Sequence, residues 1–153
     1  MKIAGDLCVY TNNTNTIEVY QKPHPMLPIE ERPLFGYWDA RGKGAQIHYL
    51  FNYLGVDYNQ KIYKRGPMPE LSKSAWLSHK DELQLDFPNL PYLVDGELKL
   101  TESKSIMKYL SKKYDQRLLG RSAEEMAKAD MVSRVHDTIY LRINEPFKNG
   151  DQD

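Results

Sequence analysis

The segment DFPNLPYLVDGELKLTES, residues 86–103, constrains the fold more than any other part of the chain. Two prolines flank Asn89-Leu90, and Asp95-Gly96 suits a tight turn between two apolar runs. The Leu90-Pro91 bond is a candidate cis peptide, which would turn the N–H and C=O groups of Leu90 outward instead of into a sheet. A helix is expected to begin near Glu102-Ser103. Exposed main-chain groups beside a helix start suit a peptide-like ligand that carries a carboxylate.

The remaining pattern predicts an α/β domain. An apolar strand at 34–38 precedes a helix at 45–55, and a second strand is expected at 56–64. Such a unit normally pairs its strands in parallel with a right-handed crossover. The hairpin at 92–100 and an amphipathic helix at 102–114 complete the order, which is βαβ followed by ββα around one mixed sheet.

Two further helices are expected outside this pattern. The polar, proline-punctuated stretch 66–83 contains one helical run near Leu71–His79. A longer helix at 123–143 stops before NEPFKNGDQD, and its apolar face has no partner in this chain. We infer that its partners are missing or are supplied by another chain.

Residues 1–33 differ in pattern from the rest of the chain. The alternating stretch CVYTNNTNTIEVYQ predicts a hairpin, and KPHPMLPIEERP predicts an extended linker. An isolated hairpin is marginal in water, so a loosely docked tail without chemistry is the favoured interpretation. The chain thus divides into an extension at 1–33, a domain at 34–115, and a linker with one helix at 116–153.

Composition excludes several kinds of protein. The 21 Lys and Arg balance the 21 Asp and Glu, so no basic field attracts nucleic acid or anionic membranes. Cys8 is the only cysteine, which excludes a Cys-x-x-Cys redox pair, and the four histidines lack metal-ligand spacing. No apolar run reaches the roughly 18 residues of a membrane span, and no signal peptide is recognisable. A cytoplasmic protein without a metal is expected.

Four motifs carry a resemblance to a known family. GYWDARG (36–42), SAWLSHK (74–80), LDFPNLPYLVDG (85–96) and LTES (100–103) resemble the glutathione-binding half of a cytosolic glutathione transferase, most similar to the mu class. The likeness runs from Leu34 to about Ile139. It implies a thioredoxin-like domain, followed by the start of an all-helical domain that is truncated here. It also implies glutathione as co-substrate, and a homodimer if the helical domain is completed.

The resemblance implies that Tyr37 is the catalytic residue, whose hydroxyl donates a hydrogen bond to the sulfur of glutathione. The chemistry needs such a donor because the thiolate is the nucleophile, and a free thiol with a pKa of about 8.5 is mostly protonated at neutral pH. A tyrosine packed at a strand end is the simpler alternative in a chain with 11 Tyr, and only the surrounding motif disfavours it.

The resemblance also implies the other site residues. Lys80 suits the glycyl carboxylate of glutathione, and Glu102, where the mu class usually has Gln, suits the γ-glutamyl ammonium. Lys43 replaces a usual apolar residue, which would shift the electrophile preference toward anionic or polar compounds. Singly, such residues are surface lysines, packed tryptophans or helix caps, so their joint spacing carries the interpretation. The expected glutathione contacts are Tyr37, Trp38, Lys43, Lys73, Trp76, Lys80, Asn89, Leu90, Pro91, Glu102 and Ser103, and the expected dimer contacts are Phe87 and Asp137.

The leading hypothesis is therefore a glutathione transferase that conjugates the thiolate of glutathione to small, largely apolar electrophiles in detoxification. The alternative is a non-catalytic binding or interaction protein of the same fold, supported by the missing substrate-pocket helices. A thioredoxin-like disulfide oxidoreductase lacks the chemistry, because Cys8 lies outside the domain and Tyr37 occupies the reactive position.

Overall fold

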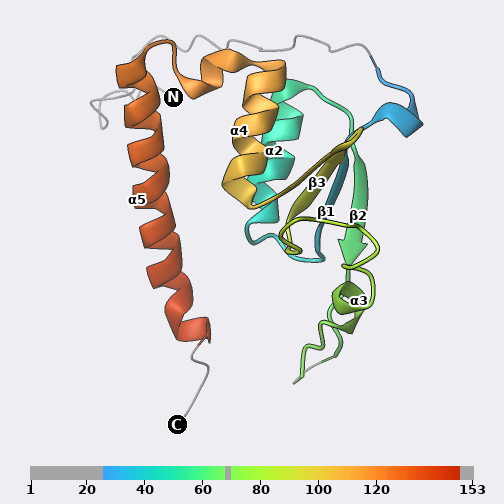
Figure 1. The fold of residues 1–153 in the computed structure, drawn as a ribbon. Helices are drawn as coiled ribbons and strands as arrows, with labels where there is room; N and C mark the ends of the chain where they lie inside the picture. The colour runs from blue at the N-terminus through green and yellow to red at the C-terminus, as the bar shows by residue number, and fades with distance from the viewer. Residues whose placement is uncertain (1–25, 68–69, 149–153) are drawn as a thin grey trace, which may run out of the picture.

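A computed structural model describes residues 26–67 and 70–148 of the chain (Figure 1). The predicted hairpin in the N-terminal extension, with Cys8 and His24, lies outside these residues. In chain order the elements are η1 (Ile29–Glu31), β1 (Leu34–Trp38), α2 (Gly44–Leu54), β2 (Asn59–Tyr63), α3 (Ser74–Leu77), β3 (Tyr92–Asp95), β4 (Leu98–Thr101), α4 (Ser103–Tyr114), η2 (Gln116–Leu119) and α5 (Ala123–Lys148).

The four strands form one mixed sheet in the order β2-β1-β3-β4. β1 and β2 are parallel, with Trp38 opposite Tyr63, whereas β3 is antiparallel to both β1 and β4. The β3–β4 turn falls at the predicted Asp95-Gly96, where Gly96 has a φ of 60°. The predicted thioredoxin-like order of βαβ followed by ββα is confirmed.

Helices α2 and α4 lie side by side against one face of the sheet (Figure 1). Their apolar faces meet the strands in a core in which Phe35, Ile47 and Leu93 are at most 1% exposed. A second buried cluster, on which Trp38 packs, is formed by Tyr63, Trp76, Leu85, Leu90 and Tyr92. Burial on both faces fixes the register in which the strands pair, because a one-residue slip of a strand would move each of its side chains to the opposite face.

Three predicted boundaries were wrong. β2 begins at Asn59 instead of residue 56, because the Val56 N–H donates to the Phe51 carbonyl and so belongs to the end of α2. α3 has only four residues, because Leu71, at a φ of 43°, is not helical. α5 continues past the predicted end at 143 to Lys148 and includes Pro146, which removes a backbone donor without ending the helix.

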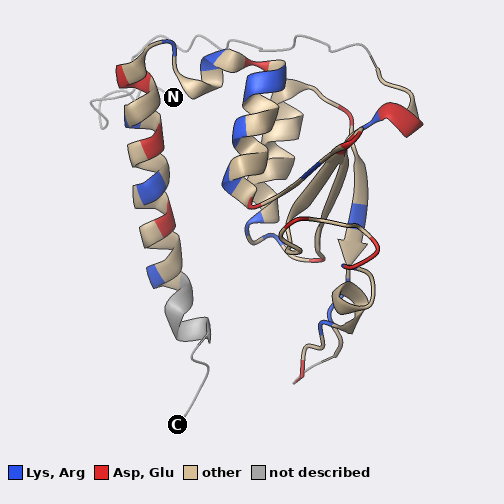
Figure 2. Cartoon of the chain, viewed as in Figure 1, with Lys and Arg blue, Asp and Glu red and all other residues tan. Residues whose placement is uncertain are grey.

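Helix α5 lies beside α4, and polar contacts join the two helices (Figure 1). The Lys104 ammonium donates to the Ser133 carbonyl at 2.7 Å and pairs with Asp137, and Lys108 pairs with Asp130 at 2.9 Å. Figure 2 shows acidic and basic residues interspersed along α5.

The apolar residues of α5 are largely exposed. Met131, Val132, Val135 and Ile139 each have more than half of their surface in contact with solvent. The polar contacts with α4 therefore hold this helix, and most of its apolar surface does not pack on the domain. Within the described part of the chain, no helix combines the length and the apolar character needed to cross a membrane.

Candidate functional site

The main chain wraps closely around Tyr37 near the end of β1. The Tyr37 hydroxyl oxygen accepts a hydrogen bond from the backbone N–H of Lys43 at 3.0 Å. A Cβ atom at Gly42 would lie 2.7 Å from this oxygen, and one at Gly44 would lie 2.3 Å from Cδ1 of the ring. Gly42 also has a positive φ of 32°. The glycines of the β1–α2 loop are therefore what allows the loop to close over the phenol.

The surroundings of Tyr37 keep its hydroxyl protonated at neutral pH. Burial raises the pKa of Tyr37, opposed by the hydrogen bond from the Lys43 N–H, and the negative charge that Tyr140 can carry raises it further. The positive charge of Arg65 contributes a smaller lowering. Since the oxygen accepts from Lys43, its own proton is directed elsewhere, and it meets no acceptor within the described residues. The site therefore offers one O–H donor.

A polar pocket of about 290 Å³ lies at the start of α4. Glu102 precedes the helix with a φ of 68°, a strained conformation for a residue other than glycine, and no side chain caps the helix. The uncapped first turn leaves backbone N–H groups to interact with an anion. The pocket is lined by Lys43, Glu102, Ser103, Lys104, Ser105, Lys108, Arg134 and Asp137. Lys43 connects this pocket to Tyr37, because its backbone N–H binds the phenol while it also lines the pocket.

The loop before β3 has the predicted cis Leu90-Pro91 bond. The Leu90 N–H donates to the side-chain oxygen of Asn89 at 2.9 Å, and its expected contact with a ligand stays a prediction. The Asn89 amide nitrogen donates to Glu102 at 3.2 Å. Leu90 itself is buried in the second core cluster. Asn89, Leu90 and Glu102 are thus brought together by the two hydrogen bonds of the Asn89 side chain.

Both tryptophans contact the ring of Tyr63. The Trp38 ring meets Tyr63 edge-on at 6.4 Å between centroids, and Trp76 does so at 5.4 Å. Trp38 is half-buried, but Trp76 is only 6% exposed and belongs mainly to the core. Lys73 immediately precedes α3, and Lys80 follows it and lies 4.0 Å from Asp81. Neither lysine has a described contact with Tyr37 or Glu102.

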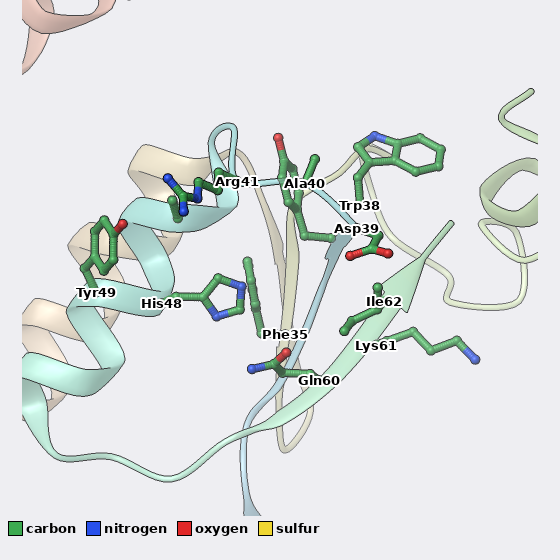
Figure 3. Close-up of a pocket in the computed structure, with 12 residues that line it drawn as sticks. Phe35, Trp38, Asp39, Ala40, Arg41, His48, Tyr49, Gln60, Lys61 and Ile62 are labelled. Carbon is green, nitrogen blue, oxygen red and sulfur yellow. The ribbon is translucent and has the colours of Figure 1, made fainter. Parts of the chain in front are cut away.

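A second pocket, of about 380 Å³, lies between α2 and the edge of the sheet, next to Tyr37 (Figure 3). Its apolar lining includes Phe35, Trp38 and Ile62. In Figure 3 the amide of Gln60 points toward His48 across the lower part of this pocket.

Two residues of this pocket, His48 and Gln60, belong to a hydrogen-bonded group that sequence reasoning missed. The Gln60 amide donates to the Tyr58 hydroxyl at 2.9 Å, and this hydroxyl lies 2.6 Å from Nδ1 of His48. Burial lowers the pKa of His48. The three residues follow no regular spacing along the chain, so no sequence pattern could have identified them.

Phe87 and Asp137, the two expected dimer contacts, have different surroundings. Phe87 is 78% exposed, so ordinary burial near its loop does not account for it. Asp137 pairs with Lys104 of its own chain, and this ammonium lowers the pKa of the Asp137 carboxyl. The participation of both residues in a dimer stays a prediction. Among the residues that the structure describes, no cluster of three or more His, Cys, Asp or Glu side chains could hold a metal ion.

Comparison with known proteins gives consistent matches. Residues 33–112 match the family described as Glutathione S-transferase, N-terminal domain. The chain is 43% identical over 115 residues to the glutathione S-transferase of Dermatophagoides pteronyssinus, covering 71% of this chain and 52% of that protein. It is 44% identical over 120 residues to glutathione S-transferase Mu 1 of Rattus norvegicus, covering 75% and 54% respectively.

The solved structures give the same match at the level of the fold. The crystal structure of the glutathione S-transferase Blo t 8 matches with a TM-score of 0.63 and 31% sequence identity, covering 72% of this chain and 49% of that one. The chain spans about half the length of the curated relatives it matches.

Proposed function

The chain belongs to the glutathione S-transferase family, and from that premise we propose that it binds glutathione and transfers its sulfur to a small, largely apolar electrophile. The observation that carries the proposal is the state of Tyr37. Its hydroxyl is protonated and has no acceptor within the described residues. Tyr37 lines one pocket and is hydrogen-bonded to Lys43, which lines the other. A donor of this kind suits a thiolate.

The proposed role of Tyr37 is to stabilise the thiolate without taking up its proton. Lowering the pKa of the bound thiol by roughly two units requires about 2.7 kcal/mol of preferential stabilisation. Hydrogen bonds to charged groups contribute about 1.5–3 kcal/mol, so one hydroxyl can account for much of this. Because burial raises the pKa of Tyr37, a phenolate general base is disfavoured. The sulfur then forms a bond to an electrophilic carbon and displaces a leaving group or adds to a double bond.

The rest of glutathione is proposed to lie across the end of the sheet at which β1 and β4 end and β3 begins. The start of α4, with Glu102 and Ser103, would bind the γ-glutamyl end, because a carboxylate matches the uncapped N–H groups and an ammonium matches Glu102. The backbone carbonyl of Leu90, beside Pro91, would accept from the cysteinyl amide. Lys73 and Lys80, with Trp38 and the exposed edge of Trp76, would hold the glycyl carboxylate.

The finer form of the proposal is a cytoplasmic mu-class transferase that acts in detoxification as a homodimer. The names of several similar relatives support the class. The exposed Phe87 supports the dimer, because a phenyl ring in solvent gains by insertion into a partner. The division of the chain at 34–115 and 116–153 belongs to this proposal as well.

Titration calorimetry of the 153-residue chain with glutathione tests the proposal at its first step. We expect saturable binding, followed by turnover with a generic aromatic electrophile. Tyr37→Phe should retain most of the affinity but raise the pKa of the bound thiol. Binding without turnover in the wild-type chain would identify a non-catalytic protein of the same fold, and a folded chain that gives no binding heat at millimolar glutathione would overturn the proposal.

A further inference from the structure

Arg65 lies beside the proposed site, although no motif in the sequence singles it out. It follows β2 by two residues, and the parallel pairing of β1 and β2 brings it to the end of the sheet where Tyr37 and Trp38 lie. Its guanidinium carbon lies 5.0 Å from the centroid of the Trp38 ring. A cation over an indole face at this distance is held by about 0.5–1 kcal/mol at an exposed site. Trp38 therefore positions the charge of Arg65.

No ion pair neutralises the charge of Arg65 within the part of the chain whose side chains the structure describes. Within residues 26–67 and 70–143, its guanidinium has no carboxylate partner, whereas Arg117 pairs with Asp115 at 2.8 Å and Arg32 pairs with Asp57 at 3.3 Å. An arginine in an ion pair contributes little field at a distance, because its partner cancels it. The field of Arg65 reaches Tyr37, since its charge lowers the pKa of that phenol.

We propose that Arg65 is an electrostatic positioning residue whose positive charge, held on the face of Trp38, stabilises the glutathione thiolate that Tyr37 binds. The inference rests on the proposed function. The charge of Arg65 should act on the thiolate much as it acts on the phenol of Tyr37. A sulfur within hydrogen-bonding distance of the Tyr37 oxygen experiences nearly the same electrostatic potential as that oxygen. Arg65 acts through space and touches neither sulfur nor electrophile, so it is not a catalytic residue.

Other charged and titratable groups surround the same point, and their contributions differ from that of Arg65. Arg65 lowers the pKa of Tyr37, whereas burial and the negative charge that Tyr140 of α5 can carry both raise it. The other charged or titratable residues that line the pocket beside Tyr37 are Asp39, Arg41, His48, Tyr49 and Lys61. Lys43, whose N–H bonds the phenol, lines the pocket at α4 together with Glu102, Lys104, Lys108, Arg134 and Asp137. Arg41 is the natural comparison for Arg65, because Figure 3 shows its guanidinium directed back over α2 on the side of Tyr49.

The test compares Arg65→Gln with Arg65→Lys and with the control Arg41→Gln, which removes the same charge from the neighbouring loop. The pKa of bound glutathione is measured by the ultraviolet absorbance of the thiolate, and kcat/KM is measured against pH with one neutral electrophile. A unit charge within about one Debye length shifts a pKa by about 0.3–0.5 unit in low salt, so Arg65→Gln should raise the thiol pKa by that amount. Arg65→Lys keeps a positive charge at this position, so its thiol pKa should stay close to that of the wild type.

The shape of the pH profile separates electrostatics from structural damage. Below the thiol pKa, Arg65→Gln should lower kcat/KM by about two- to three-fold, and above it the variant and the wild type should converge. Raising the salt concentration should reduce the difference. A loss of equal size at every pH, or an equal shift in Arg41→Gln, would overturn the role of Arg65 while leaving the transferase proposal intact. Absence of glutathione binding in the wild-type chain would overturn both.

Discussion

The side chain of Asn89 makes two hydrogen bonds, accepting from the Leu90 N–H at 2.9 Å and donating to Glu102 at 3.2 Å. It therefore ties the loop before β3 to the residue that precedes α4. Glu102 has a φ of 68°, so the conformation of this residue needs support from its neighbours.

Replacing Asn89 should weaken glutathione binding. Asn89→Ala removes both hydrogen bonds and should cost about 1–2 kcal/mol of binding free energy, or roughly five- to thirty-fold in Kd. Asn89→Asp is the informative partner, because it keeps an acceptor for the Leu90 N–H but sets a second carboxylate against Glu102. Calorimetric titration should show a lower affinity for glutathione in Asn89→Asp than in the wild type. If both variants bind like the wild type, Asn89 has no part in positioning Glu102.

Gly44→Ala should disturb catalysis more than folding. The added methyl group would lie 2.3 Å from Cδ1 of Tyr37 and must displace the ring. Alanine suits the first turn of α2 better than glycine, which offsets part of the steric cost to stability. We expect a fall in kcat of at least about ten-fold, which corresponds to about 1.4 kcal/mol, with a smaller change in glutathione affinity. An unchanged kcat would show that the position of the ring is not critical.

Gly36→Ala should destabilise the fold. Its Cβ would lie 2.1 Å from the ring of Tyr92, which is fully buried and hydrogen-bonded to Tyr63 at 3.1 Å. Overpacking of this kind costs about 1–3 kcal/mol or more. Gly96→Ala is the control, because nothing lies within 4 Å of its Cβ and only its φ of 60° is unfavourable, at about 1 kcal/mol. Urea unfolding should place the midpoint of Gly36→Ala below that of Gly96→Ala, and the reverse order would contradict the described packing.

Acid should destabilise the domain through His48. Burial lowers the pKa of His48 in the folded state, so the unfolded chain binds its proton at a higher pH than the folded chain does. The free energy of unfolding therefore decreases as the pH falls below about 6.5, the ordinary value for histidine, and through the lower pKa of the folded state. His48→Gln should flatten the dependence of stability on pH below about 6.5, and the control His136→Gln, which removes an imidazole from exposed α5, is measured beside it. Equal slopes in all three proteins would exclude His48 as the source.

Lys104 should control the docking of α5 on α4. Its ammonium bonds the Ser133 carbonyl and pairs with Asp137, so Lys104→Met removes both contacts. We expect about 1 kcal/mol less protection of the α5 amides, or roughly five-fold faster hydrogen exchange. Lys128→Met is the control, because it removes an ammonium from α5 that has no contact with α4 in the described part of the chain. Similar exchange in both variants would mean that another interaction holds the helix.

The sequence predicted the central fold well because its signals there were local. The apolar run at 34–38 correctly predicted strand β1, and Asp95-Gly96 correctly predicted the turn after β3. Gly55 correctly predicted the end of α2, where it adopts a left-handed conformation. The errors arose where tertiary contacts decide. Val56 is apolar enough for a strand, but its N–H bonds the Phe51 carbonyl at the end of α2. Pro146 lies within α5 and does not end the helix.

The candidate site could be predicted only in part. Motif spacing grouped Tyr37, Lys43 and Glu102 as glutathione contacts, and the structure joins these residues through one hydrogen bond and one pocket, while their role in binding stays a prediction. It could not show that Asn89 satisfies the Leu90 N–H, since that depends on a side-chain rotamer. Nor could it identify Arg65, whose position over Trp38 depends on the register of β2 against β1.

The alternation of side chains in β1 limits the insertions and deletions that this strand can tolerate. Phe35 belongs to the core that contains α2 and α4, Leu34 and Trp38 pack on the second cluster, and Tyr37 packs against both. Inserting or deleting one residue before Tyr37 would exchange the phenol and the indole between the two faces and would remove the reactive group from its loop. Length variants in β1 that retain activity should therefore differ by two residues, a restriction that does not apply to the loop between α2 and β2.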